Sequence, residues 1–373
     1  MSPEDSINLL DRSTTKNKVS WKQSGKIVPE EFISLAFRPP IPSTPNMYCY
    51  NEQFVKRFAS IPPRFRKLNS GRRICYFDDD DGDESNTVVV CFHDQGQGKY
   101  IFLPKQHIDG LRVIGVDLFG TGGSSPEPEN ALRDEKYSID ELKDDLIEFL
   151  RRLKIKNLYI VGHGTGSLVC QVLTAQLQLQ DQSCVKGLIL IGGLPPPLDV
   201  SVDEKMMLDI KSTLRNPLDL TGKGMIQTWR RMMLRLHARL NYIKDNSRDW
   251  GFAKYYVKVI RLRHGSNAST LEKMDQDHYL ISKILYSSST GYQNTSQYVN
   301  EYSRLFTKPT RDMKDITCPV YIYHGSHDKV LPATITKYFL GPYPNAKIIT
   351  LDGFGHSSIL LELDNILKTV CLA

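Results

Sequence analysis

Four loops carry the residues that could do chemistry in this chain, and each directly follows an apolar run typical of a buried strand. The loops are His93–Gly96, Gly162–Gly166, His324–Asp328 and Gly353–His356. A carboxylate and an imidazole on two such loops are the pair that activates a nucleophile in covalent hydrolysis. Asp328 and His356 are the candidates for that pair.

The Gly162–Gly166 turn has no nucleophile at its centre. It reads Gly-His-Gly-Thr-Gly, between a strand pattern over 157–161 and a helical stretch over 167–178. Strand, tight turn and helix form the context of the G-x-S-x-G nucleophile elbow, whose outer glycines avoid a clash in the sharp turn. The central residue, whose hydroxyl would attack a carbonyl, is Gly164.

Residues from about 70 to the C-terminus resemble the α/β-hydrolase superfamily, in its serine esterase, lipase and proline-iminopeptidase-like branch. Elbow, acid and histidine follow in the order of that fold, and Asp117–Ser124 resembles its D-x-x-G-x-G-x-S turn. The resemblance implies an α/β-hydrolase fold with a mostly parallel central sheet, helices on both faces and a helical cap insertion. It makes Asp328 the triad acid, His356 the base and Gly164 the degenerate nucleophile position.

The resemblance also implies an oxyanion hole, made by the backbone N–H of Thr165 and by the loop His93, Asp94, Gln95 and Gly96. The family usually has His-Gly at this loop, whereas this chain has His93-Asp94. A carboxylate near a developing oxyanion opposes catalysis, because the site must stabilise negative charge there. Glycine in the elbow is also expected to leave a small void beside the histidine, large enough for a water molecule.

The chain divides into three parts by pattern. Residues 1–70 are polar and punctuated by proline, and we expect a partly disordered N-terminal extension with one short helix around 51–59. Residues 71–198 and 311–373 form the predicted hydrolase core. Strand patterns stop after 187–191 and resume near 317, so residues 199–310 are the predicted helical cap or lid.

Two further segments carry local signals. The acidic run Asp78–Glu84 does not have the spacing of a calcium loop and predicts a solvated hairpin turn between the first two strands. Ser138–Glu141 is a capping box that opens a helix. The apolar face expected for that helix consists of Leu142, Leu146, Phe149, Leu150 and Leu153.

The predicted cap is basic, with 18 Lys and Arg against 11 Asp and Glu. Apolar residues at helical spacing over 225–240 are flanked by arginines. Such a helix can contact an anionic membrane or a protein partner. The simpler interpretation is that its apolar face roofs the pocket while its arginines face water. The modest net charge of +6 and the lack of a recognised module argue against nucleic acid.

Composition favours a protein of the cytoplasm without a cofactor. The seven cysteines show no metal-type pairs, no apolar run reaches the length of a membrane span, and Met1–Asp5 lacks the features of a signal peptide. We expect no metal site and no cofactor.

Three functions remain open from the sequence. The first is a pseudo-hydrolase, catalytically impaired, that binds a small-molecule ligand in a pocket under the cap, or a partner through the cap. The second is an active hydrolase of ester, amide or peptide bonds that uses His356 and Asp328 with water or another nucleophile. The third is a membrane-associated scaffold that acts through the basic cap helix and the N-terminal arm.

Overall fold

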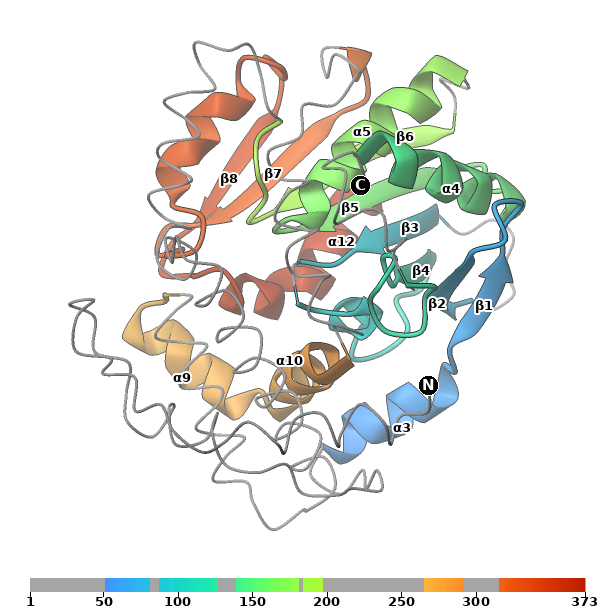
Figure 1. The fold of residues 1–373 in the computed structure, drawn as a ribbon. Coiled ribbons are helices and arrows are strands. Elements are labelled where there is room, and N and C mark those ends of the chain that lie inside the picture. Colours follow the sequence, from blue (N-terminus) through green and yellow to red (C-terminus); the bar gives the residue numbers. More distant parts are fainter. Residues whose placement is uncertain are drawn as a thin grey trace, which may run out of the picture.

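The protein is built on one eight-stranded sheet, shown in Figure 1. The computed structural model describes residues 51–80, 87–94, 96–126, 139–180, 184–196, 265–290 and 315–372. The strands are β1 (Arg64–Lys67), β2 (Arg73–Asp79), β3 (Thr87–Phe92), β4 (Leu111–Val116), β5 (Leu158–His163), β6 (Val185–Ile191), β7 (Val320–Gly325) and β8 (Lys347–Leu351). The described helices are α3 (Glu52–Ser60), α4 (Ile139–Arg152), α5 (Gly166–Gln180), α9 (Ala268–Gln276), α10 (His278–Thr290) and α12 (Leu363–Cys371). Short 3-10 turns are η3 (Lys99–Phe102), η6 (Ala333–Phe339) and η7 (Ser358–Glu362).

The sheet has the order β1-β2-β4-β3-β5-β6-β7-β8. From β4 to β8 all neighbours are parallel, while β2 is antiparallel to both β1 and β4. The chain moves outward from β3 in both directions, so the strand order reverses there. The carboxyl ends of parallel strands next to such a reversal are where α/β proteins place their sites. The predicted mostly parallel central sheet is confirmed.

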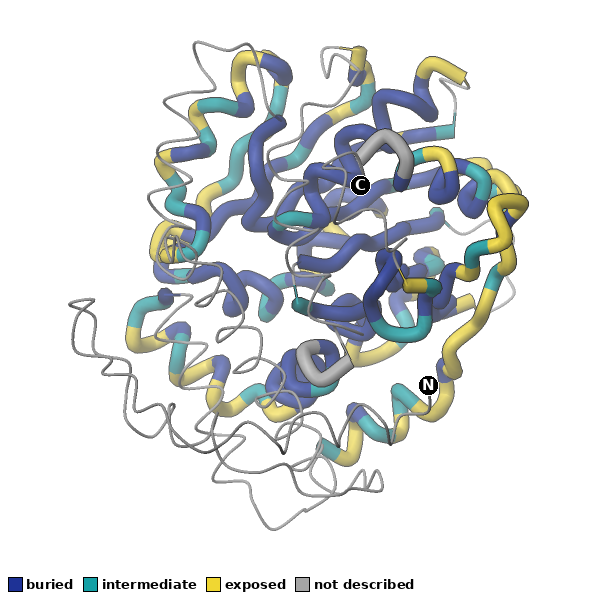
Figure 2. Tube along the Cα trace, in the orientation of Figure 1, coloured by how far each residue is buried: buried dark blue, intermediate teal, exposed yellow. Residues whose placement is uncertain are grey.

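Each central strand is apolar on both faces, because helices cover the sheet on both sides (Figure 2). One face packs against α4, α5 and η6, through residues such as Val90, Ile160 and Leu190. The other face packs against α3, η3, α10 and α12, through their strand neighbours such as Val89, Val161 and Ile189. Alternate residues of one strand therefore enter two separate cores.

Helix α4 forms where the capping-box pattern predicts a helix. Its expected apolar residues Leu142, Leu146, Phe149 and Leu150 are buried, and Leu153, just past its end, packs on the same core. The capping residue Ser138 lies outside the described residues.

The hairpin turn predicted for the acidic run is wrong. Strands β2 and β3 are not neighbours, because β4 lies between them. Asp78 and Asp79 are buried in β2 and not solvated. Asp78 accepts two hydrogen bonds from Arg112, at 2.8 and 2.7 Å, and one from Arg64 at 2.9 Å. Asp79 pairs with Arg57 of helix α3. Charge pairing with arginines from neighbouring elements thus stabilises these buried carboxylates, which a one-dimensional pattern does not reveal.

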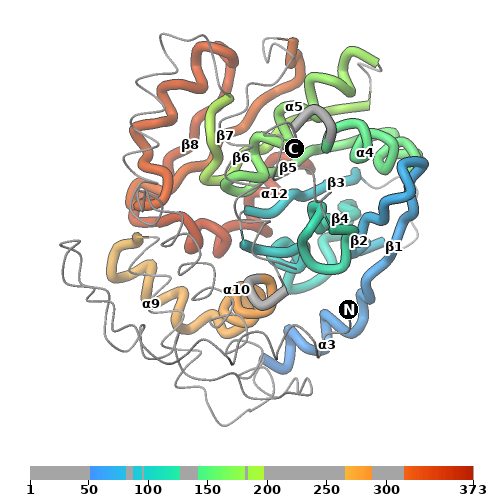
Figure 3. Tube along the Cα trace, viewed as in Figure 1, coloured from blue at the N-terminus to red at the C-terminus, as the bar shows by residue number. Residues whose placement is uncertain are grey.

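The sheet begins before residue 71. Strand β1 belongs to it, and helix α3, expected around 51–59, precedes β1 and lies beside α10 (Figure 3). Asn51 caps α3 by accepting a hydrogen bond from the Phe54 N–H, and its own N–H donates to Ser282 Oγ at 2.9 Å. The fully buried Phe54 ring contacts Tyr279 of α10, with centroids 5.7 Å apart. Helix α3 and strand β1 are therefore part of the packed domain.

Within the predicted cap, the structure describes residues 265–290, which form α9 and α10 without any strand. The basic helix predicted over 225–240 and the boundaries at 199 and 310 lie outside the described residues. Among the described helices, none is both long enough and apolar enough to cross a membrane.

Candidate active site

The site lies where four parallel strands end. Asp94 follows β3, Gly164 follows β5, Asp328 lies three residues after β7, and His356 lies in the loop after β8. Because β3 and β5 are neighbours, as are β7 and β8, the four loops form two adjoining pairs at one edge of the sheet. Long-range sheet pairing thus gathers residues separated by up to 262 positions.

Gly164 forms the sharp turn between β5 and α5, in the left-handed conformation with φ of 53°. Its N–H donates to the Ile191 carbonyl at 3.0 Å. The outer glycines are sterically required, since a Cβ on Gly162 would overlap the Ser167 backbone and one on Gly166 would overlap the backbone of Phe92 and His93. The turn therefore has the tight strand–helix geometry predicted from the sequence.

Asp328 and His356 form the predicted contact. His356 Nδ1 lies 2.8 Å from Asp328 Oδ2, and both residues are buried. The other oxygen, Oδ1, accepts the backbone N–H groups of Val330 and Leu331, each at 2.8 Å. The carboxylate is thus fixed by its own loop and holds the imidazole in one orientation.

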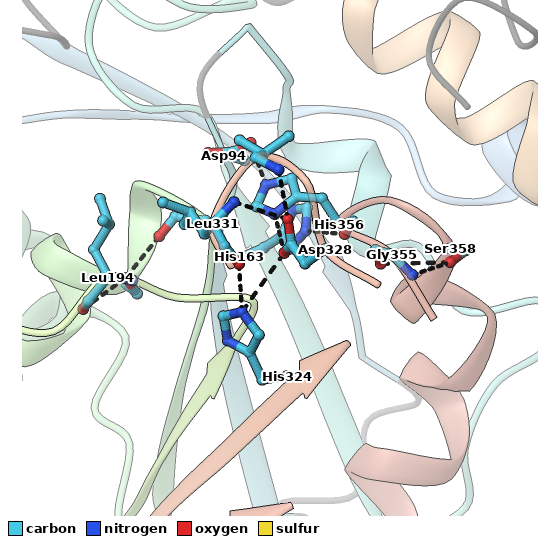
Figure 4. Close-up of polar contacts among 12 residues, drawn as sticks. Asp94, His163, Leu194, His324, Asp328, Leu331, Gly355, His356 and Ser358 are labelled. Carbon is cyan, nitrogen blue, oxygen red and sulfur yellow. Dashed lines mark hydrogen bonds and ion pairs between the residues drawn. The ribbon is translucent and has the colours of Figure 1, made fainter. Parts of the chain in front are cut away.

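Asp94 occupies the space beside the Gly164 turn, as the close-up in Figure 4 shows for its approach to His356. Its Oδ2 lies 3.0 Å from His356 Nε2, and its Oδ1 accepts the Thr165 N–H at 2.7 Å. A Cβ on Gly164 would overlap Oδ1 and Cγ of this carboxylate and lie 2.8 Å from Oδ2. The prediction of a void at Gly164 is therefore wrong, because the Asp94 side chain fills that space.

His356 is held as a cation by this arrangement. Each ring nitrogen faces a carboxylate oxygen, which only accepts hydrogen bonds, so both nitrogens must carry protons. Burial opposes the charge, but Asp328 and Asp94 outweigh it and raise the pKa of His356 to about 10. Burial likewise opposes the Asp94 charge, and His356 overcomes it, holding the pKa of Asp94 far below its usual range. A doubly protonated ring has no lone pair with which to act as a general base.

His163 lies against His356 but has the opposite electrostatic character. The two rings are 4.9 Å apart, and His163 Nε2 lies 3.0 Å from the His356 carbonyl oxygen. Burial, and then the positive charge of His356, lower the pKa of His163 to about 4. His163 is therefore a neutral, buried side chain beneath the Gly164 turn. It supports the backbone of the loop that carries His356.

The backbone of Asp94 is fixed independently of its side chain. Its carbonyl accepts the Gln97 N–H at 3.1 Å and lies 2.9 Å from His93 Nδ1. His93 Nε2 accepts the Leu118 N–H at 3.2 Å, which leaves the proton on Nδ1 to donate to Asp94. Gly96 completes the loop in a left-handed conformation, with φ of 73°.

The D-x-x-G turn supports this loop from the next strand. Asp117 Oδ1 accepts the Lys99 N–H at 2.8 Å, and Asp117 Oδ2 accepts from Lys99 Nζ at 2.6 Å and from the Gly123 N–H at 3.0 Å. Since Lys99 opens η3, directly after the Asp94 loop, this buried ion pair anchors the far end of the loop. The motif recognised in the sequence therefore has a positioning role here.

The entrance to α9 contacts both loops that follow β7 and β8. The Asn267 N–H donates to the Gly353 carbonyl at 2.8 Å, and Ser266 Oγ lies 2.7 Å from Ser358 Oγ. A Cβ on Gly265 would overlap the His327 carbonyl. Helix α10, continuing from α9, packs against η3 behind the Asp94 loop. Helix α9 and the residues before it thus contact the loop that carries His356, and helix α10 contacts η3, which follows the Asp94 loop.

The structure brings together most residues singled out by sequence, with Gln95 outside the described residues. Gly164, Asp94, Thr165, Asp328 and His356 meet, while His93 and Gly96 shape the loop from behind. Sequence reasoning did not foresee that Asp94 contacts His356 directly. The available signal was the coincidence of a carboxylate in the loop predicted to form an oxyanion hole with a glycine at the centre of the predicted elbow. The supporting residues missed by sequence were Gln97, Asn267 and Gly192, whose missing Cβ leaves room for the His356 ring.

The chain belongs to the alpha/beta hydrolase fold family, whose model matches residues 88–363.

Curated relatives match shorter stretches. Bifunctional epoxide hydrolase 2 of Rattus norvegicus is 25% identical over 130 residues, covering 35% of this chain and 20% of that protein. The corresponding protein of Sus scrofa is 37% identical over 60 residues, or 16% of this chain and 10% of that protein. Putative carbamate hydrolase RutD of Yersinia enterocolitica is 28% identical over 113 residues, or 30% of this chain and 37% of that protein. These matches span well under two thirds of each relative.

Solved structures match over most of the chain. An esterase from Thermogutta terrifontis superposes with a TM-score of 0.53 at 14% identity, covering 83% of this chain and 96% of that one. An enol-lactonase from Burkholderia xenovorans LB400 gives 0.52 at 17% identity, with coverage of 82% and 98%. At such identities the likeness shows the fold alone.

Proposed function

We propose that this protein is a pseudo-hydrolase, which keeps the hydrolase framework for binding and does not use serine-type covalent catalysis. In this proposal Gly164 stands at the nucleophile position of the elbow. The observation that carries it is the Asp94 carboxylate, which holds both the Thr165 N–H and His356 Nε2. Those are the two groups that an oxyanion and a serine hydroxyl would need.

In this proposal, each of the three parts of a serine mechanism is missing or blocked. The attacking hydroxyl is missing, the base is held protonated, and the donor for the oxyanion is engaged by a negative charge. Loss of a serine alone removes nearly all covalent rate enhancement, with perhaps 10³–10⁴-fold over water remaining. The proposed role is binding of a small-molecule ligand in a pocket under a helical cap over 199–310, of which α9 and α10 would be part.

Labelling with a fluorophosphonate probe tests this proposal, since the probe reports an activated serine. We expect no labelling of the wild-type protein. Gly164→Ser alone should also remain unlabelled, because the Asp94 carboxylate occupies the space of the new side chain. The double variant Asp94→Gly, Gly164→Ser removes the competing carboxylate and should gain labelling at residue 164.

The informative control is Asp94→Gly alone, which removes the carboxylate from His356 Nε2 without adding a nucleophile and should stay unlabelled. Robust labelling of the wild-type protein, mapped to any serine or threonine, would falsify the non-catalytic assignment.

A second candidate function is hydrolysis with Asp94 as the nucleophile. One observation favours it, namely that the carboxylate already contacts an imidazolium and an amide N–H, the groups that covalent catalysis requires. The relatives named as epoxide and carbamate hydrolases make such chemistry worth testing. With an epoxide, Asp94 would attack carbon, the ring C–O bond would break, and the alkoxide would take the His356 proton. Neutral His356 would then deprotonate water, and the hydroxide would attack the Asp94 ester carbonyl. The acyl C–O bond would break and the departing alkoxide would take the carboxyl proton, which releases the diol and regenerates the Asp94 carboxylate and the His356 cation.

Single turnover in heavy-oxygen water separates the two candidates. Styrene oxide, 4-nitrophenyl acetate and a simple aryl carbamate form a suitable substrate panel. Asp94 as nucleophile requires that heavy oxygen enter the Asp94 carboxylate and that Asp94→Asn abolish turnover. We expect neither turnover nor isotope incorporation, which would leave the binding role as the better account.

A further inference from the structure

The Asp94 carboxylate sits in its site as a ligand would. Its two oxygens meet two donors that come from different strands, the Thr165 N–H at 2.7 Å and His356 Nε2 at 3.0 Å. Gly164 leaves the space that the carboxyl carbon fills. Thr165 lies at the start of the 15-residue helix α5, whose dipole also favours an anion. The Thr165 N–H, the His356 cation and the space beside Gly164 together match the size, charge and hydrogen-bonding pattern of one carboxylate.

The backbone of Asp94 is held by contacts outside this site. Its carbonyl is held from behind by Gln97 and His93. Rotation about the Cα–Cβ bond would therefore move the carboxylate without breaking these backbone bonds.

An anion would restore the contacts of an emptied site. Without Asp94, the Thr165 N–H and His356 Nε2 lose an acceptor that they now share, and hydrogen bonds between a charged donor and a charged acceptor are the strong ones. Asp328 and His356 carry opposite charges, so one added carboxylate would restore the net charge of −1 that the three groups carry together now. A neutral carbonyl offers one oxygen and no charge, whereas a free carboxylate reproduces both contacts.

We propose that Asp94 is an internal ligand of a carboxylate-binding site formed by Thr165, His356 and Gly164, and that the small-molecule ligand of this protein bears a carboxylate that takes its place. This inference rests on the proposed binding function and names its ligand class. The tethered carboxylate competes with every free acid, so a natural ligand must make further contacts. Simple acids bind measurably only when the tether is removed.

The test uses Asp94→Gly in the full chain with acetate as the probe. Acetate should raise the melting temperature of the variant and saturate, with a midpoint at least ~10-fold lower than any midpoint of the wild-type protein. Imidazole nitrogen NMR should show His356 Nε2 shifting toward its wild-type frequency as acetate binds. Chloride at equal ionic strength is the control for non-specific salt effects.

Asp94→Asn is the matched variant, because its amide keeps the site filled without the charge. It should show no saturable response to acetate. Asp94→Ala provides a second emptied site if Asp94→Gly does not fold. A folded Asp94→Gly or Asp94→Ala protein whose melting and His356 signals respond equally to acetate and chloride would overturn the inference. Failure of the pseudo-hydrolase proposal is separate, since it would appear as fluorophosphonate labelling of the wild-type protein.

Discussion

The two halves of the site differ in how closely they keep the arrangement of a hydrolase. On the β7–β8 side, Asp328 and His356 make the contact expected of an acid and a base, supported by two backbone N–H groups on the acid. On the β3–β5 side, Gly164 carries no side chain and Asp94 reaches across to His356. Gly164 and Asp94 fit one another, because the glycine gives the carboxylate its space.

This complementarity makes Gly164 and Asp94 one packed unit. His356 Nε2 has the Asp94 carboxylate as a partner, and a buried imidazolium between two carboxylates results. Buried ion pairs of this kind are sensitive to removal of either partner, because the remaining charge stays desolvated.

The largest expected effect comes from breaking the retained half. Asp328→Asn should destabilise the fold by about 3–5 kcal/mol, the usual range for removing one partner of a buried pair. Asp94→Asn should cost less, because Asp328 is the stronger contributor to the raised pKa of His356. Denaturant unfolding of both variants measures the difference. An equal or reversed ranking would contradict the view that Asp328 is the principal partner.

Next in size is the steric conflict at the turn. Gly164→Ser should destabilise the fold by about 1–3 kcal/mol, because the new Cβ would overlap the Asp94 carboxylate. Adding Asp94→Gly should recover part of this loss, which a double-mutant cycle measures directly. Gly166→Ser is the matched control, since its Cβ would meet the backbone of Phe92 and His93, and Asp94→Gly should not rescue it. Equal rescue of both serine variants would show that Asp94 does not define the space at Gly164.

The pH dependence of stability should distinguish the two adjacent histidines. The pKa of His356 is raised to about 10 from an unfolded value near 6.5, so its stabilisation is complete below about pH 6.5 and is lost as the pH rises toward 10. The pKa of His163 is lowered to about 4, so its contribution is present above about pH 6.5 and is lost as the pH falls toward 4. Each limb has a limiting slope of about 1.4 kcal/mol per pH unit.

Unfolding measured from pH 4 to 10 tests both limbs. Asp94→Asn should flatten the alkaline limb and leave the acid limb from His163 in place. An alkaline limb unchanged in Asp94→Asn would mean that Asp94 does not hold the His356 proton.

The smallest expected effect lies at the entrance to α9. Asn267→Ala removes the cap of α9, where Asn267 Oδ1 accepts the Thr270 N–H at 2.8 Å, and loosens its packing on Gly353. We expect a loss of about 1 kcal/mol, together with faster hydrogen exchange in the loop that carries His356. Asn51→Ala removes the comparable cap of α3, far from that loop, and should leave its exchange unchanged. Equal exchange in both variants would separate α9 from the site.

The sequence by itself determined the fold and the retained half of the site. Apolar strand runs, the glycine turn and the order of acid and histidine are local patterns, and the sheet converts that order into proximity. The same patterns located Gly164 and flagged Asp94 as unfavourable for an oxyanion. They also placed α4, because a helix with one apolar face is a property of a short segment.

Only the tertiary structure decided what Asp94 does. Its contact with His356 spans 262 positions and depends on which strands are neighbours, which side-chain rotamer is adopted and how much space Gly164 leaves. The burial of Asp78 and Asp79 has the same origin, since their arginine partners arrive from α3, β1 and the adjacent strand β4. Periodicity reports which face of an element is apolar. It carries no information on the distant partner that makes a buried charge favourable. In this site the distant partner of His356 is Asp94.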